Sequence, residues 1–410
     1  MSGDVAIIGI GCILPHGEGN AAMDRALDGQ CAARISQSGG QPYVVGRVPN
    51  DLAAGCAGQD RGVTLALRAA EQAMRDAGLD CAAHAERPAE VSLGGIAPER
   101  FACLFALSKG GLDLFGRLFA LGGTADGRSP TWFGDVDPAA ALRHIGARYG
   151  FRGPMLTPIS ACASGGHTFT RARSLLLEGR AEAVLCGAAD ASLVPAVLAS
   201  YRRLGLLAPV DGAPAGCCRP FAADRAGFYV GEGAAAFVVT SMETAARLGR
   251  RPRARLVAGA EGAFAHSLIT VPTDGLDLAH LIGLALKRAG LAAEDVDLVG
   301  AHGTATREGD LNEARAIRLA LGDEAGEVGI MATKPVHGHL LGAACAVESA
   351  LLIRVVETGR LPPMICLGMT DGPGDLGRIV PTRSDSPVAV AVKLSAGFGG
   401  QISVNVFRAP

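Results

Sequence analysis

Short apolar runs alternate with segments of helical periodicity along this chain. Runs typical of buried strands occupy residues 5–9, 101–107, 183–186, 234–240, 296–300, 389–394 and 401–407. Residues 59–79 carry apolar side chains at helical spacing, and Gly78 is a stop signal at their end. Strands that alternate with helices in this way predict an α/β protein.

Two features divide the chain near residue 245. Residues 247–255 are basic and contain Gly249 and Pro252, as a connector between lobes would. Each part also ends in a glycine-rich turn before an apolar strand, at residues 231–233 and 397–400. We therefore expect two similar α/β halves, 1–245 and 246–410, packed as one rigid body.

Composition narrows the class of protein. The 410 residues carry 38 Lys and Arg against 40 Asp and Glu, and 49% are hydrophobic while 4% are aromatic. A disordered chain would be poor in apolar residues, and a nucleic-acid-binding protein would show a basic excess. No apolar run has the length of a membrane span, and the N-terminus has no leader pattern. We expect a cytoplasmic globular protein, with part of its weakly charged surface covered by another subunit.

The cysteines and glycine motifs exclude several cofactors. The 11 cysteines are scattered without a C-x-x-C pair, which argues against a disulfide frame or a zinc cage and for a reducing compartment. The turn after the first strand resembles a dinucleotide loop, but Leu14 stands where the third glycine belongs. No phosphate-binding loop ending in Gly-Lys-Ser/Thr occurs either. Nucleotide binding is therefore not expected.

Cys162 has the sequence context of a nucleophile. Only small residues flank it, in Ser160-Ala-Cys-Ala-Ser-Gly-Gly166, and a helical stretch follows. At a strand-to-helix turn, the helix N-terminus would lower the pKa of the thiol, and flanking N–H groups would face a developing oxyanion.

Two further segments place histidines at glycine turns. His302 ends the strand at residues 296–300, where an α/β sheet presents ligand-binding groups. Lys334, His337 and His339 precede an apolar helical segment. No carboxylate or cysteine stands at metal-ligand spacing from these histidines, so no metal site is predicted.

These segments together resemble the β-ketoacyl synthases of fatty-acid and polyketide assembly. The resemblance rests on Ala161-Cys-Ala-Ser-Gly165, His302-Gly-Thr-Ala-Thr306, Lys334 and Gly338-His-Leu-Leu-Gly-Ala343, with Arg219-Pro-Phe221 and Gly397-Phe-Gly-Gly400 in matching order. It extends over nearly the whole chain. A histidine at 339 resembles the elongating Cys-His-His branch, that of the fatty-acid KAS II enzymes and of type II polyketide ketosynthases.

The resemblance implies a thiolase-like fold of two α/β halves in five layers (αβαβα), usually a homodimer and in some cases a heterodimer with a related subunit. It also implies an acyltransferase that condenses malonyl-carrier protein with an acyl chain held on Cys162. His302 and His339 would stabilise the enolate, Lys334 would polarise the site with Glu348 as its partner, and the N–H groups of Cys162 and Phe398 would form the oxyanion hole. Thr304 and Thr306 match pantetheine-binding positions, whereas Asp310 and Glu313 are assigned structural hydrogen bonds. No metal or other cofactor is implied.

The chain departs from the family pattern at several places. Leu394 and Ala396 stand before the glycine-rich turn in place of Asn and Phe, and the opposing loop at residues 264–272 lacks an expected Asp. Lys109 lies in a loop expected to line the pocket. These differences indicate a specialised pathway, and acyl length and branching stay open.

Two alternatives remain on the same fold. One is a non-elongating partner subunit of the chain-length-factor type, which would lack the nucleophile. The other is a CoA-dependent, thiolase-type acyltransferase. The expected partner is an acidic acyl carrier protein, with Arg202-Arg203 or residues 247–255 as candidate docking surfaces.

Overall fold

The computed structural model describes residues 3–54, 59–79, 93–120, 132–210, 212–322, 328–363, 384–385 and 387–410. Its large sheet contains β1 (Val5–Leu14), β2 (Gly17–Glu18), β5 (Phe101–Leu107), β6 (Met155–Leu156), β7 (Ala183–Asp190), β9 (Gly233–Ser241), β10 (Ala254–Ala263), β11 (Leu298–Gly300), β12 (Gly329–Met331), β15 (Val390–Ala396) and β16 (Gln401–Arg408). Two small sheets contain β3 (Arg34–Ser38), β4 (Gln41–Gly46) and β8 (Val230–Gly231), and β13 (Arg360–Leu361) and β14 (Ser384–Asp385).

Twelve α-helices connect these strands within the described residues. They are α1 (Gly19–Leu27), α2 (Arg61–Asp76), α3 (Leu112–Ala120), α4 (Trp132–Val136), α5 (Ala140–Tyr149), α6 (Ser164–Leu177), α7 (Pro195–Arg203), α8 (Met242–Arg247), α9 (Leu276–Ala289), α10 (Arg307–Leu321), α11 (Lys334–His337) and α12 (Ala344–Thr358). None of the helices in the described part of the chain combines the length and the hydropathy that crossing a bilayer requires.

The large sheet has the same strand order on both sides of its centre. Outward from the centre, one side runs β1-β9-β7-β5-β6 and the other runs β10-β16-β15-β11-β12. On each side the two inner pairs are antiparallel and the two outer pairs are parallel. The sides join where β1 pairs with β10, from Val5 opposite Leu256 to Ile7 opposite Ala254. The chain therefore contains two halves of one topology.

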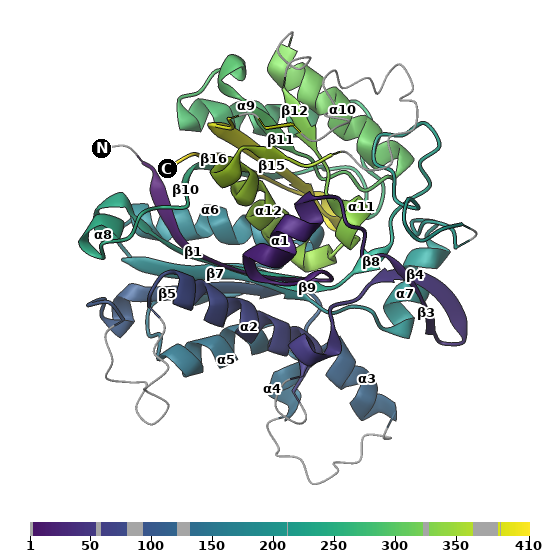
Figure 1. Ribbon diagram of the computed structural model, residues 1–410, viewed down its shortest axis with the longest axis horizontal. Helices are drawn as coiled ribbons and strands as arrows, with labels where there is room; N and C mark the ends of the chain where they lie inside the picture. The colour runs from purple at the N-terminus through teal and green to yellow at the C-terminus, as the bar shows by residue number, and fades with distance from the viewer. Residues whose placement is uncertain are drawn as a thin grey trace.

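The helices separate the two sides into layers (Figure 1). Helices α2 and α5 cover the outer face of one side, and α9, with α10 packed on it, covers the outer face of the other. Helices α6 and α12 lie between the two sides and contact each other. Phe169 of α6 shows this packing, because its ring lies 4.6 Å from that of Phe237 in β9 and 5.5 Å from that of Phe407 in β16. The predicted five-layer, thiolase-like fold is confirmed.

The predicted elements agree with the structure except around residue 254. All of the predicted strands are present, and helix α2 begins after Asp60, whose carboxylate accepts a hydrogen bond from Gly62 N–H at 2.7 Å. Part of the predicted connector is instead strand, because β10 begins at Ala254. The division of the chain at residue 245, which falls inside α8, stays a prediction.

The glycines of the first strand serve close packing. A Cβ atom on Gly9 would lie 2.2 Å from the carbonyl oxygen of Ala73, and one on Gly11 would lie 2.0 Å from that of Ala69. Helix α2 therefore rests directly on the backbone of β1. The glycine pattern that resembles a dinucleotide loop is a helix-packing surface.

Candidate active site

Cys162 lies in a tight turn at the start of α6. The turn is a 3-10 helix, Ala161–Ala163, and Ala161 has a φ of +46°, a region that costs an alanine conformational energy. Ser164 closes the turn, since its Oγ donates to Ala161 O at 2.7 Å and accepts from Ser160 N–H at 2.9 Å. The small residues after Cys162 let α6 meet α12, because a Cβ on Gly165 would lie 2.7 Å from Ala346 N.

The thiol of Cys162 is protonated at neutral pH. Burial raises its pKa to about 11, and the positive charges of Lys109 and Lys334 offset this effect only in part. The sequence-based prediction of a lowered pKa is therefore wrong. The helix start was visible in the sequence, but the side chain is only 7% exposed, and burial disfavours the thiolate.

A carboxylate on α10 holds the loop of His302. Glu313 accepts hydrogen bonds from the N–H groups of His302, at 2.5 Å, and Gly303, at 2.8 Å. Asp310, one helical turn earlier, accepts from Phe221 N–H at 2.7 Å and Ala305 N–H at 3.1 Å. Both buried carboxylates therefore bind backbone N–H groups and fix the loop between β11 and α10.

Behind His302 lies a buried cluster of three charged side chains. Lys334 Nζ donates to Glu348 Oε1 at 2.6 Å, to His302 O, and to His302 Nδ1 at 3.4 Å. Lys393 Nζ lies 2.8 Å from the other oxygen of Glu348 and donates to the carbonyls of Ala301 and Leu394. Burial alone would raise the pKa of Glu348, but the two ammonium groups lower it, so the carboxylate stays ionised.

His339 is fixed by its own turn. Its N–H donates to Tyr229 O at 2.7 Å and its carbonyl accepts from Gly231 N–H at 2.9 Å, which ties it to β8. Its Nδ1 accepts from Leu341 N–H at 3.3 Å. His337, in contrast, is buried between Thr333 Oγ1 and Gly338 O and does not line the cavity described below.

Both imidazoles are neutral and share one tautomer. Burial and the charge of Lys334 lower the pKa of His302 and of His339 well below the ordinary value. Each Nδ1 accepts a hydrogen bond, from Lys334 or from Leu341, so each ring carries its proton on Nε2. Two N–H donors are thus presented from rings whose centroids lie 5.4 Å apart.

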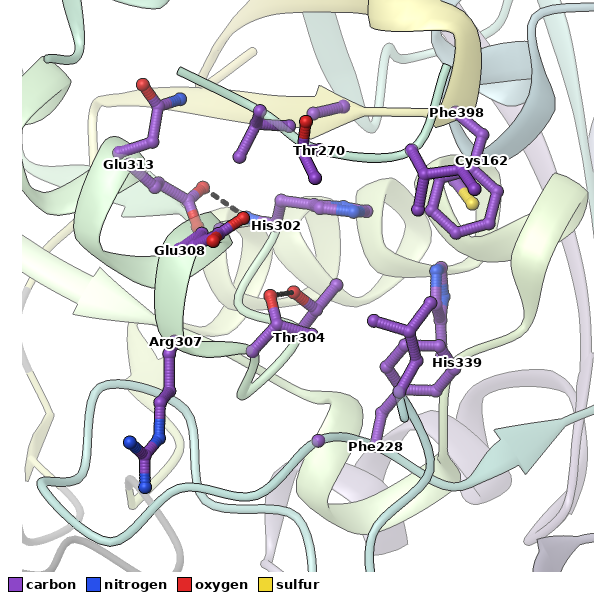
Figure 2. A pocket seen from close by; sticks show the side chains of 18 of the residues that line it. Cys162, Phe228, Thr270, His302, Thr304, Arg307, Glu308, Glu313, His339 and Phe398 are labelled. Atoms are coloured by element: carbon purple, nitrogen blue, oxygen red, sulfur yellow. Dashed lines mark hydrogen bonds between the residues drawn. The ribbon is translucent and has the colours of Figure 1, made fainter. Parts of the chain in front are cut away.

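One cavity of about 510 Å³ collects these groups (Figure 2). Its lining includes Cys162, His302, His339, Thr304, Thr306, Glu313 and Phe398. Figure 2 shows the nitrogen-bearing edges of the two imidazoles turned toward the side of the cavity that holds the Cys162 sulfur. Thr304 and Thr306 are joined by a 3.0 Å hydrogen bond between their hydroxyls, and Figure 2 shows Thr304 on the wall opposite Phe398. Lys334, Glu348 and Asp310 stand behind this lining.

The glycine-rich turn that follows β15 touches the Cys162 turn. A Cβ on Gly397 would lie 2.8 Å from Ser160 O and 2.9 Å from Cys162 N. The opposing loop, residues 264–272, is hydrogen-bonded to the glycine-rich turn. Gly399 N–H donates to Leu268 O at 2.9 Å, and Phe264 N–H donates to Gly400 O at 2.8 Å. Leu394 and Ala396, where the chain departs from the family pattern, line the cavity next to this turn.

The structure adds residues that the sequence did not single out. Lys393 shares Glu348 with Lys334, and it sits inside an apolar strand where a lysine gives no recognisable signal. Tyr201 and Phe228 also line the cavity, and the Phe228 ring lies 4.8 Å from that of His339. Across the described ranges, no group of three or more His, Cys, Asp or Glu side chains is arranged to hold a metal ion.

Two family models match the chain. The model of the β-ketoacyl synthase N-terminal domain matches residues 56–245, and that of the β-ketoacyl synthase C-terminal domain matches residues 257–367. The chain therefore belongs to the β-ketoacyl synthase family, and it is an acyltransferase that forms β-ketoacyl products.

Relatives at 30–33% identity come from Rhizobium, Streptomyces and Mycobacterium. Nodulation protein E of Rhizobium meliloti is 33% identical over 350 residues, 85% of this chain and 82% of that protein. The ketoacyl synthase alpha subunit of the tetracenomycin polyketide synthase of Streptomyces glaucescens is 30% identical over 431 residues, 99% of this chain and 97% of that protein. The 3-oxoacyl-[acyl-carrier-protein] synthase 2 of Mycobacterium bovis is 33% identical over 264 residues, 64% of this chain and 63% of that protein.

Solved structures agree with the fold along the whole chain. A type II polyketide ketosynthase, solved with its acyl-carrier protein and bound to a hexaketide, superposes with a TM-score of 0.87 at 28% identity, over 100% of both chains. The ishigamide ketosynthase/chain length factor superposes with a TM-score of 0.86 at 25% identity, again over 100% of both chains.

Proposed function

We propose that this chain catalyses the decarboxylative Claisen condensation of malonyl-carrier protein with an acyl group bound to Cys162. The product is a β-ketoacyl-carrier protein two carbons longer than the acyl group. One observation carries this proposal. The Cys162 thiol and the Nε2–H donors of two neutral histidines line the same cavity. A nucleophile beside two donors suits a reaction that passes through an acyl-thioester and then an enolate.

In the first step, Cys162 takes the acyl group. Its sulfur attacks the thioester carbonyl, the bond from that carbon to the carrier sulfur breaks, and the thiol proton ends on the departing carrier thiol. The oxyanion of the tetrahedral intermediate would be held by the N–H groups of Cys162 and Phe398. The close approach of Gly397 to the Cys162 turn supports this pairing.

In the second step, malonyl-carrier protein loses CO₂. The electron pair of the broken carbon–carbon bond forms an enolate, whose oxygen would accept from Nε2–H of His302 and His339. The enolate carbon then attacks the acyl carbonyl, a carbon–carbon bond forms and the bond to Cys162 breaks. The cysteine thiolate regains one proton from water. Neutral histidines suit this step because an imidazolium ring in the cavity would transfer its extra proton to the enolate and so remove the carbon nucleophile.

The buried charged cluster would support the two histidines from behind the cavity lining. It consists of Lys334, Lys393 and Glu348. The hydrogen bond from Lys334 Nζ keeps His302 Nδ1 unprotonated, so the ring offers Nε2–H to the substrate. Glu348 neutralises part of the charge, because two buried ammonium groups without a carboxylate would be costly. We propose no metal or redox cofactor for this chemistry. Thr304 and Thr306 would contact the pantetheine arm that delivers each thioester.

We propose an acidic acyl carrier protein as partner, docked at the end of α7. Arg202 and Arg203 stand between Tyr201 and Leu204, which both line the cavity. Arg203 is exposed, whereas the guanidinium of Arg202 lies 3.7 Å over the ring of Tyr43. The alternative surface at residues 247–255 is less suited, since Arg247 pairs with Glu182 and Arg253 pairs with Asp76 and Glu357. Arg203→Glu should raise the KM for carrier-bound substrates and leave acylation by small thioesters unchanged.

We further propose that the chain works as a dimer, with the edge strand β6 at the contact. Among the described strands β6 pairs only with β5. Leu156 in this strand is 40% exposed, and Ile159, shortly after it, is 55% exposed. Light scattering on the purified protein tests this assembly, because a monomer at micromolar concentration would contradict it.

The choice of donor tests the proposed reaction. The enzyme, acylated from a carrier protein that bears the acyl group, is given ¹⁴C-carboxyl-labelled malonyl-carrier protein together with CoA, and released ¹⁴CO₂, the carrier-bound product and acyl-CoA are measured. Equal amounts of CO₂ and β-ketoacyl-carrier support condensation. Acyl exchange onto CoA without CO₂ would indicate the thiolase-type alternative, and absence of both would indicate a non-elongating partner subunit.

A further inference from the structure

We propose that Lys109 and Asp190 form a positioning pair, which holds the turn after His339 and sets the charge beside Cys162. The inference rests on the proposed condensation, because it assigns these two residues a role in that reaction. Neither belongs to the catalytic set described above. Lys109 follows β5, and Asp190 is the last residue of β7.

Asp190 is the centre of a buried hydrogen-bond network. Its side chain is 2% exposed, and Oδ2 lies 2.6 Å from Lys109 Nζ and accepts from Gly342 N–H at 3.1 Å. Ser108 Oγ donates to the same oxygen at 3.3 Å, and Ser192 N–H donates to Oδ1 at 3.1 Å. One carboxylate thereby joins the ends of β5 and β7 to the segment that follows His339.

The anchored segment is the one that fixes the His339 tautomer. Leu341, whose N–H donates to His339 Nδ1, has a φ of +47° and is followed directly by Gly342. A leucine in this region is strained and needs its surroundings to hold it. The contact is tight, since a Cβ on Gly342 would lie 2.3 Å from Ser108 Oγ. Loss of the Asp190 acceptor would free Gly342 N–H and with it the turn that presents His339.

The turn that Asp190 holds, Leu341–Ala343, packs against the Ala161–Ala163 turn that carries Cys162, so the pair lies close to the nucleophile. Lys109 supplies the positive charge of the pair. Seven titratable groups surround Cys162. Tyr201, His302 and His339 line the cavity with it, whereas Lys109, Asp190, Lys334 and Glu348 act on it through their charges from behind the lining. Among the charges, that of Lys109 does most to lower the pKa of the Cys162 thiol, ahead of Lys334, while Asp190 and Glu348 raise it. The two members of the pair therefore act on the nucleophile in opposite directions, with Lys109 dominant.

The pH profile of Cys162 alkylation tests the charge of the pair. The rate of iodoacetamide labelling is measured on the Cys162 peptide by mass spectrometry. Because this assay needs no substrate, it reports the effect of the pair on Cys162 even if the proposed condensation fails. Lys109→Met should slow labelling at pH 8 about tenfold, as an upward shift of about one pH unit requires. Asp190→Asn should speed it, and the double variant should fall between the two. Lys109→Arg should restore the wild-type profile, and Lys287→Met on the surface of α9 should not change it.

Condensation kinetics test the positioning role. Asp190→Ala should lower kcat for CO₂ release at least tenfold with little change in the KM for malonyl-carrier protein, and ¹⁵N-histidine spectra should show His339 losing its single Nε2–H tautomer. Superimposable alkylation profiles for wild type, Lys109→Met and Asp190→Asn would overturn the charge role. An unchanged kcat in Asp190→Ala would overturn the positioning role. If wild type itself releases no CO₂, the condensation proposal fails, and the alkylation profiles and histidine spectra still decide whether the pair exists.

Discussion

Lys334 Nζ lies 2.6 Å from Glu348 Oε1, and both side chains are almost completely buried. Lys393 Nζ approaches the other carboxylate oxygen at 2.8 Å, so one acid serves two ammonium groups behind His302. Such a cluster is stable only while every charge keeps its partner, because removing one partner leaves the others buried and uncompensated. The same cluster sets the tautomer of His302 through the hydrogen bond from Lys334.

Glu348→Gln should therefore destabilise the fold strongly. The variant keeps the size of the side chain but leaves two buried ammonium groups without a carboxylate, and the free energy of unfolding should fall by about 3–5 kcal/mol. Urea unfolding followed by circular dichroism measures this change. Glu294→Gln, at an exposed position, is the matched control and should stay within about 0.5 kcal/mol of wild type. A loss below about 1 kcal/mol in Glu348→Gln would show that the cluster is not the charged unit described here.

His302→Ala and His339→Ala should each lose decarboxylation. Each variant removes one Nε2–H donor to the enolate oxygen, and loss of one such donor costs about 10²–10³ in rate. Release of ¹⁴CO₂ from labelled malonyl-carrier protein measures this step apart from acylation. The exposed His280 provides a control, since His280→Ala should keep the wild-type rate. Wild-type CO₂ release in either active-site variant would remove that histidine from the mechanism.

Alkylation of free Cys162 should depend steeply on pH. Burial raises the pKa of this thiol to about 11, so the thiolate fraction is small at neutral pH and grows about tenfold with each pH unit until that value is approached. The iodoacetamide rate at the Cys162 peptide should therefore rise log-linearly from pH 7 to 10. A plateau that begins near pH 8 would mean that the thiol is activated in the free enzyme.

Gly397→Ala should block the nucleophile. The added methyl group would lie 2.8 Å from Ser160 O and 2.9 Å from Cys162 N, both backbone atoms that can move only with the turn itself. Because small displacements of reacting groups are costly, the rate of acylation should fall about 10²-fold. Mass spectrometry of samples quenched at successive times measures the rate at which the acyl-enzyme forms. Gly283→Ala on α9 introduces the same methyl group into open space, and equal rates in the two variants would contradict the close contact.

The sequence predicts the parts of this site that lie in turns rich in glycine and other small residues. Cys162, His302 and His339 each stand in such a turn, and the fold brings the three turns to one cavity. The separation of these residues along the chain does not give the distances between them in the fold. The tautomers of His302 and His339 therefore follow only from the structure, and the pairing of Lys334 with Glu348 follows from the family resemblance or from the structure.

Other features left no readable mark in the sequence. Lys393 lies in the apolar run of β15, where a lone lysine looks like a solvent-facing position, yet the structure buries it against Glu348. Strand β10 has no clear strand pattern in the sequence, because Arg255, Glu261 and two glycines interrupt its apolar residues, although most of it is buried. The raised pKa of Cys162 cannot be predicted from the sequence, because a sequence shows where a helix begins but not how deeply a side chain is buried.

The central claim is that Cys162 holds the growing chain and releases it to a malonyl-derived carbon. Intact-protein mass spectrometry tests it most directly. Wild type incubated with acyl-carrier protein should gain one acyl mass, located on the Cys162 peptide, and should lose it on addition of malonyl-carrier protein as β-ketoacyl-carrier appears. Cys162→Ala should gain no mass, while Cys217→Ser should behave as wild type. Stoichiometric acylation of Cys162→Ala, or loss of the acyl group as free acid without a β-ketoacyl product, would contradict the account.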